Sequence, residues 1–170
     1  SNQTNGAFDP SAAGLFSYYS KCKKEGVLMD ESLTAEHLSH RGMDLIEMDP
    51  NGFPQKKDSL LSLNFNAIAK GYFVDLLADY IASKGCENYL VEVGGEMRLK
   101  GQNLEGGLWK VGVNVPLIEA AEDDYFKVLE VQNTAVATSG NYQNFYMVDG
   151  EVIGHTLDPR TGKPVISNLK

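Results

Sequence analysis

The sequence predicts an α+β fold in which helices pack on a mostly antiparallel β-sheet. Apolar residues recur at helical spacing before Gly85, whereas the segments after it are short, rich in β-branched and aromatic residues, and separated by glycine or asparagine. Asp149-Gly150, a preferred two-residue hairpin turn, stands between two apolar runs. Because helices come first and strands follow, the order favours an α+β fold over a doubly wound parallel one.

Three helices are expected in the first half of the chain. Asp9 is expected to cap the first helix and Pro10 to occupy its first helical position, because these residue types are favoured there. A second helix is expected over 34–40 and a longer third one over 63–81, where apolar residues recur every three or four positions. Gly85 follows the third helix and is a typical C-terminal stop.

Extended segments make up the rest of the predicted fold. "MDLIEMD" leads into the turn "DPNG", and "SLLSLNF" leads into the long helix. Gly94 and Gly95 separate two strands and indicate a bulge or a close approach of the backbone to something flat, with Glu92 and Glu96 expected to project from one side. The strands expected after Gly85 are "NYLVEV", "EMRLKG", "LWKVGVNV", "KVLEV" and "TAVATSG", followed by the hairpin "NFYMVDGEVIGHT".

Composition limits the classes of function. With 170 residues and 42% hydrophobic content the chain is long enough for one sizeable core, so a single domain over 1–170 is expected. The formal net charge of -8 and the scattered basic residues argue against a nucleic-acid partner. No apolar run approaches the roughly 20 residues that a membrane span needs. Because the net charge is negative, an anionic ligand requires positive charge placed locally at its site.

Two residue pairs of metal or redox interest have ordinary interpretations. Cys22 and Cys86 lie far apart and match neither a zinc spacing nor a redox motif, so free thiols are expected, with a disulfide left open. His37 and His40 form an HxxH pair, but no carboxylate or cysteine stands at a supporting offset. The pair is interpreted as part of a solvated helix face.

Lys70 is the first candidate for chemistry. In a helical projection it shares an apolar stripe with Phe73, Leu77 and Ile81, so it is expected to face inward or towards a cleft. One interpretation is a lysine whose stem covers apolar surface while its ammonium reaches water. The other is an anion clamp near a helix start, where free backbone N–H groups and the helix dipole also attract negative charge.

His155 is the second candidate. It leaves a predicted strand just before a turn in which Asp158, Pro159 and Gly162 are ordinary turn residues. Turn chemistry does not account for the histidine, which either satisfies a core contact or donates to a phosphate or a ring edge. "VATSGNY" ends a strand in small polar residues that suit a phosphate, but it lacks the pattern of a nucleotide-binding glycine-rich loop.

Six segments, taken together and in order, resemble the ApbE family, the bacterial FAD:protein FMN transferases. They run from the first residues to the last, and no single motif carries the resemblance. It implies an ApbE-like, T-fold-like α+β fold and a chain that is the central portion of a longer protein. The segments are "NGAFDPS", "LNFNAIAKGYFVD", "NYLVEVGGEMRLKG", "WKVGV", "VATSGNY" and "HTLDPRTGKPV".

The resemblance implies an enzyme that transfers FMN from FAD to a threonine hydroxyl of a target flavoprotein and releases AMP. It also implies Mg²⁺, which with a few cations neutralises the diphosphate. The implied acceptor is a flavoprotein such as a membrane redox-pump subunit. The implied location is the periplasmic side of the bacterial cytoplasmic membrane, with a lipid anchor, although neither a signal nor a lipobox cysteine stands in this sequence.

The family's site residues carry over to seven positions. Asn64 and His155 are the expected catalytic residues, and the backbone carbonyl of Ala67 is the expected metal ligand. Ala7, Phe8 and Asp9 are expected to line the adenosine part of FAD. The whole set of expected FAD contacts is Ala7, Phe8, Asp9, Asn64, Lys70 and His155.

Asn64 departs from the family pattern, which commonly has an aspartate there. The amide keeps its hydrogen-bonding capacity but loses a charge and any role as a base, so slower transfer is expected more than weaker FAD binding. The family's remaining metal ligands, an aspartate and a threonine or serine, are expected beyond Lys170. Two alternatives stay open: an FAD diphosphatase, in which water replaces the threonine, and a flavin-binding module without catalysis.

Overall fold

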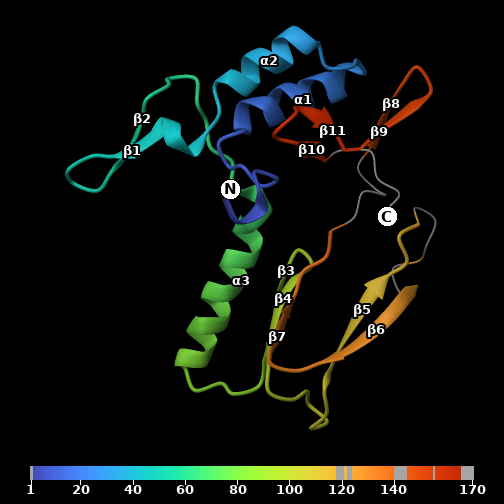
Figure 1. The fold of residues 1–170 in the computed structure, drawn as a ribbon. Helices are drawn as coiled ribbons and strands as arrows, with labels where there is room; N and C mark the ends of the chain where they lie inside the picture. The colour runs from blue at the N-terminus through green and yellow to red at the C-terminus, as the bar shows by residue number, and fades with distance from the viewer. Residues whose placement is uncertain (1, 118–120, 122–123, 140–144, 155, 166–170) are drawn as a thin grey trace. The chain divides into compact units, whose positions relative to one another are not determined.

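The chain folds into two compact units (Figure 1). One unit combines residues from 2–65 with residues from 145–165, and the other takes residues from 66–139. Each unit has its own buried cluster of apolar side chains. The computed structural model describes residues 2–117, 121, 124–139, 145–154 and 156–165.

The first unit is built on two helices, α1 (Ala13–Glu25) and α2 (Glu31–Ser39), which pack against each other (Figure 1). Leu15 and Tyr19 of α1 are buried against Leu157. The Tyr19 hydroxyl donates a hydrogen bond to the Gly154 carbonyl, and burial together with the neighbouring Tyr146 raises the pKa of Tyr19 to about 12. The core therefore ties the first helix to the last strands of the unit.

Short antiparallel pairs complete the first unit. Asp149 and Gly150 have φ values of 51° and 85° and close the hairpin between β8 and β9, which confirms the predicted turn. The remaining elements are η1 (Asn2–Thr4), η2 (Met43–Leu45), β1 (Ile46–Met48), β2 (Pro54–Lys56), β8 (Phe145–Val148), β9 (Glu151–Gly154), β10 (Leu157–Asp158) and β11 (Lys163–Pro164).

The second unit packs one helix on a three-stranded sheet. The helix α3 (Asn66–Ser83) lies along the sheet in Figure 1, and its Val74 and Ala78 are buried against Tyr89 and Val91. All strand pairs are antiparallel. The sheet has the order β3 (Tyr89–Val93), β4 (Glu96–Lys100), β7 (Thr134–Val136), and a separate pair is formed by β5 (Trp109–Asn114) and β6 (Tyr125–Val131).

The α+β class and the antiparallel pairing are confirmed, but two expectations about the architecture are wrong. The described strands form five small sheets instead of one. The first helix begins at Ala13 and has no side-chain cap, because the carboxylate of Asp9 is occupied by Ser11 and Arg41. The other helices shift by a few residues at their ends, and Asp30 caps α2 by accepting from Leu33 N–H at 2.9 Å.

The structure describes the surroundings of the two cysteines and of the two histidines of the HxxH pair. Cys22 is buried, Cys86 is exposed, and both are free thiols. His37 stacks on Tyr18, His40 Nδ1 lies 2.6 Å from Asp58 Oδ2, and both histidines are half-buried. Among the described residues, no helix combines the length and apolar character needed to cross a membrane.

Candidate functional site

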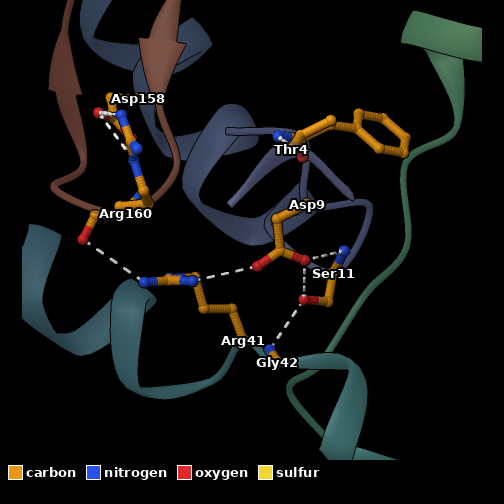
Figure 2. Close-up of polar contacts among 8 residues, drawn as sticks. Thr4, Asp9, Ser11, Arg41, Gly42, Asp158 and Arg160 are labelled. Atoms are coloured by element: carbon orange, nitrogen blue, oxygen red, sulfur yellow. Dashed lines mark hydrogen bonds and ion pairs between the residues drawn. The ribbon is translucent and has the colours of Figure 1, made fainter. Parts of the chain in front are cut away.

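Asp9 lies at the centre of a polar network in the first unit (Figure 2). Its Oδ1 accepts hydrogen bonds from the backbone N–H of Ser11 at 3.0 Å and from the Ser11 hydroxyl at 2.5 Å. Its Oδ2 accepts from Nη1 of Arg41 at 3.1 Å. Ser11 Oγ accepts in turn from the backbone N–H of Gly42 at 2.8 Å. Both carboxylate oxygens are thus engaged inside the protein, with 7% of Asp9 exposed.

The electrostatics of Asp9 follow from these partners. Burial alone raises the pKa of a carboxyl, but the hydrogen bonds from Ser11 and Arg41 and the Arg41 charge outweigh it. The pKa of Asp9 therefore lies below its ordinary value of 3.8, and the carboxylate is ionised at neutral pH.

Arg41 extends the network to a third segment. Its Nη2 donates to the carbonyl of Arg160 at 3.4 Å, and Arg160 in turn clamps Asp158 with donors at 2.7 and 2.8 Å (Figure 2). The Arg160 hydrogen bonds lower the pKa of Asp158 to about 2. The turn that follows His155 in sequence is therefore tied through Arg41 to the loop around Asp9.

The loop before Asp9 leaves two side chains available to a ligand. The N–H groups of Ala7 and Phe8 are both satisfied by Thr4, at 3.0 Å in each case. Ala7 is exposed and Phe8 is half-buried. A methyl group and an aromatic ring on an ordered loop can contact a flat apolar ligand, whereas the engaged Asp9 carboxylate mainly holds the loop in shape.

Asn64 lies beside this loop. Its backbone N–H donates to the Pro10 carbonyl at 2.7 Å, and an isolated parallel bridge joins Ser62 to Ala12. The structure therefore places Asn64 beside Pro10, which directly follows the 7–9 segment in the first unit. The expectation of a helix from 63 is wrong by three residues, because α3 begins at Asn66 and Asn64 precedes it.

Lys70 belongs to the second unit and is held by two acceptors. Its Nζ lies 2.5 Å from Oε2 of Glu96 and 2.8 Å from the carbonyl oxygen of Gly94. About half of the Lys70 side chain (49%) is exposed, and its ammonium is directed at the β3–β4 turn. Val74 and Ala78, one and two turns further along the same side of the helix, are buried against the sheet. Lys70 thus combines a fixed ammonium with access to solvent.

The paired glycines form the turn under Lys70. Val93 pairs with Glu96, so Gly94 and Gly95 are the two residues of a tight hairpin turn, with φ values of 58° and 93° that favour glycine. A Cβ at Gly94 would lie 3.2 Å from Cδ of Lys70. The two glycines therefore form a turn instead of the expected bulge, and among the described residues the group close to the backbone of Gly94 is the lysine stem and nothing flat. Glu96 pairs with Val93, the neighbour of Glu92, so the two glutamates lie on opposite faces of the hairpin, which corrects the expectation that they share one side.

The remaining carried-over positions are Ala67 and His155. Ala67 is exposed in the first turn of α3. His155 lies outside the described residues. Among the residues that the structure describes, no three His, Cys, Asp or Glu side chains gather where they could hold a metal ion.

Sequence reasoning missed Arg41 and the role of Glu96. Arg41 is 32 residues from Asp9, and nothing in its local pattern distinguishes it from a surface arginine. Glu96 did carry a signal, because it adjoins the paired glycines, but its partner Lys70 lies on another element. Both contacts depend on the tertiary fold.

Comparison with known proteins places the chain in a group of relatives. It is 35% identical over 172 residues to an FAD:protein FMN transferase of Vibrio cholerae, covering 95% of this chain and 48% of the relative. With the FAD:protein FMN transferase of Escherichia coli it shares 32% identity over 127 residues, which cover 75% of this chain and 36% of the relative. The chain thus spans about half or less of the length of these curated relatives.

Solved structures agree in fold. The ApbE protein of Thermotoga maritima superposes with a TM-score of 0.77 at 32% identity, covering 96% of this chain and 52% of that one. The flavin transferase ApbE of Vibrio cholerae gives a TM-score of 0.75 at 32% identity, covering 96% and 51%. The sequence model of the ApbE family matches residues 1–170, and the chain belongs to this family.

Proposed function

We propose that this protein is an FAD:protein FMN transferase that joins FMN to a threonine hydroxyl of a target flavoprotein. The observation that carries the proposal is the Lys70 ammonium, which is held by two acceptors on a half-exposed side chain. The chain also matches an FAD:protein FMN transferase over 95% of its length. In the reaction the threonine oxygen forms a bond to the FMN phosphorus, the bond from that phosphorus to the bridging oxygen breaks, and AMP leaves with that oxygen.

Each carried-over residue has a proposed role. Lys70 donates to the diphosphate and offsets its negative charge. Ala7 and Phe8 contact the adenosine part, while Asp9 holds their loop and offers its backbone. Asn64 hydrogen-bonds to the nucleotide, and His155 accepts the proton that the threonine hydroxyl loses. These roles rest on the family and on the local surroundings of each described residue.

The Mg²⁺ that the family implies is not matched by a complete set of ligands in the described residues. When bound, such an ion supplies positive charge to the diphosphate. Ala67 offers one backbone carbonyl, whereas Mg²⁺ requires six oxygen ligands in near-octahedral geometry, commonly with carboxylates among them. No cluster of three acidic or other ligating side chains lies among the described residues. We therefore derive no step through the metal.

Weak ligand binding by the 170-residue chain is the expected consequence. Isothermal titration of this chain with Mg²⁺ and with FAD is expected to show poor metal binding and weak FAD binding. The reason is that the Ala67 carbonyl supplies one of the six oxygen ligands that Mg²⁺ requires. Tight, magnesium-dependent binding of FAD by the same chain would contradict this prediction.

Asn64 supports one alternative, a flavin-binding module without catalysis. An amide cannot act as a base, so FAD could be held and left intact. The transferase reading is preferred because Lys70 is fixed at the exposed start of its helix. We also propose, from the family alone, that the acceptor is a membrane redox-pump subunit and that the full-length protein is lipid-anchored on the periplasmic side of the bacterial cytoplasmic membrane.

The decisive experiment incubates the full-length protein with FAD, Mg²⁺ and an acceptor domain that carries the target threonine. The intact mass of the acceptor is expected to increase by one FMN, and His155→Ala is expected to abolish most of this increase. AMP released without an adduct would instead show an FAD diphosphatase. Bound FAD that stays intact would show the binding module.

A further inference from the structure

Lys70 and Glu96 form a pair in which the carboxylate is the less exposed partner. The Glu96 side chain is 20% exposed, against 49% for Lys70. Oε2 of Glu96 is buried and has no hydrogen bond of good geometry in the described part of the chain, so the ion pair with Lys70 at 2.5 Å is its polar contact there. A buried carboxylate oxygen needs a cation, and this one depends on Lys70.

The lysine is held at three points along its length. Its Cδ passes over Gly94 closely enough that a Cβ there would lie 3.2 Å away, and its ammonium contacts both the Gly94 carbonyl oxygen and Oε2 of Glu96. An ammonium has three N–H donors. Within the described residues two acceptors contact it, which leaves one donor direction for a ligand.

We propose that Glu96 is a positioning residue that fixes the Lys70 ammonium for its contact with the FAD diphosphate. This inference rests on the proposed function, because it assigns Lys70 to that diphosphate. A fixed ammonium stabilises charge that develops in the transition state without having to reorganise. A long lysine side chain without such an anchor samples many rotamers, and ordering it opposes the reaction.

The same carboxylate has an opposite effect on binding. Its negative charge lies beside Lys70 and repels an incoming diphosphate, so the pair as a whole attracts an anion less than a lone lysine does. Glu96 therefore weakens the ground-state binding of FAD while it favours the chemical step. Interactions that act in the transition state and not in the ground state raise kcat instead of lowering KM.

The test measures FMN transfer by full-length Glu96→Gln, with saturating acceptor and varied FAD. Loss of the charge is expected to lower kcat about tenfold and to lower the KM for FAD roughly threefold. Glu96→Asp restores the charge and is expected to return KM to the wild-type value and to recover part of kcat. The matched control is Glu130→Gln, an exposed carboxylate 4.0 Å from Lys110, which is expected to change neither constant.

A double mutant shows whether Glu96 acts through Lys70. In the Lys70→Ala background, Glu96→Gln is expected to leave kcat unchanged, because there is no ammonium to position. An equal loss of kcat in both backgrounds, an unchanged kcat in the single variant, or a KM that rises would each overturn the proposal. Thermal unfolding of every variant checks that a change in kcat or KM does not come from loss of the folded state.

The dissociation constant of FAD, read from flavin fluorescence, separates the two proposals. Tighter FAD binding by Glu96→Gln in a protein that transfers no FMN would overturn the transferase function alone and support the placement of Glu96 at the anion. Unchanged or weaker FAD binding by this variant, in a wild-type protein that does transfer FMN, would overturn the role of Glu96 alone. A full-length protein that does not bind FAD would overturn both.

Discussion

Lys70→Ala is expected to lower the rate of FMN transfer by the full-length protein about 100-fold or more, the usual effect of removing one preorganised donor at a site of developing charge. The structure gives the physical reason, since Gly94 and Glu96 hold the ammonium while about half of the Lys70 side chain is exposed. An alanine removes the donor and leaves the buried Oε2 of Glu96 without its cation. The rate is measured from the mass of the acceptor after timed incubation with FAD and Mg²⁺.

The matched control for this variant is Lys110→Ala. Lys110 lies in the same unit, 68% of its side chain is exposed, and its nearest acidic partner is 4.0 Å away. Its removal changes the net charge by the same amount and is expected to leave the transfer rate within about twofold, because exposed pairs contribute little. Equal losses in the two variants would show that general charge, and not the placement of Lys70, matters.

The sequence predicted the secondary structure well wherever local chemistry decides it. The Asp149-Gly150 hairpin follows from residues that favour positive φ, and the end of α3 near Gly85 follows from the same property. The start of α1 was missed for a tertiary reason. Asp9 has the chemistry of a helix cap, but Arg41, far along the chain, engages its carboxylate and the helix begins at Ala13.

The candidate site was only partly predictable for the same reason. The paired glycines predicted a bulge or a close approach to something flat, whereas they form a two-residue hairpin turn beside the Lys70 stem. Lys70 itself was found because a cation within an apolar stripe is unusual, but the sequence did not show that its ammonium contacts the β3–β4 turn. Contacts between elements depend on how the elements pack, and a single sequence carries no record of that packing.

Asp9→Ala is expected to lower the free energy of unfolding by about 2–4 kcal/mol at pH 7, the range for removing one partner of a buried, hydrogen-bonded charge pair. The substitution breaks the hydrogen bonds from Ser11 and leaves the Arg41 guanidinium, whose Nε is buried and unpaired among the described residues, without its anion. Urea unfolding of the full-length protein, followed by circular dichroism, measures the effect. Glu47→Gln, which breaks the exposed pair with Lys57 in the same unit, is the matched control and is expected to change stability by less than about 0.5 kcal/mol.

The pH dependence of this difference tests its electrostatic origin. The folded-state pKa of Asp9 is lower than its ordinary value of 3.8, so the carboxylate stabilises the fold fully above the unfolded pKa, and the stabilisation is lost as the pH falls through the folded value. The difference in the free energy of unfolding between the wild type and Asp9→Ala is therefore expected to be constant from pH 7 down to about pH 5. It is expected to narrow below pH 4. A gap that stays constant through this acidic range would show that lost packing, and not the ionised carboxylate, accounts for the destabilisation.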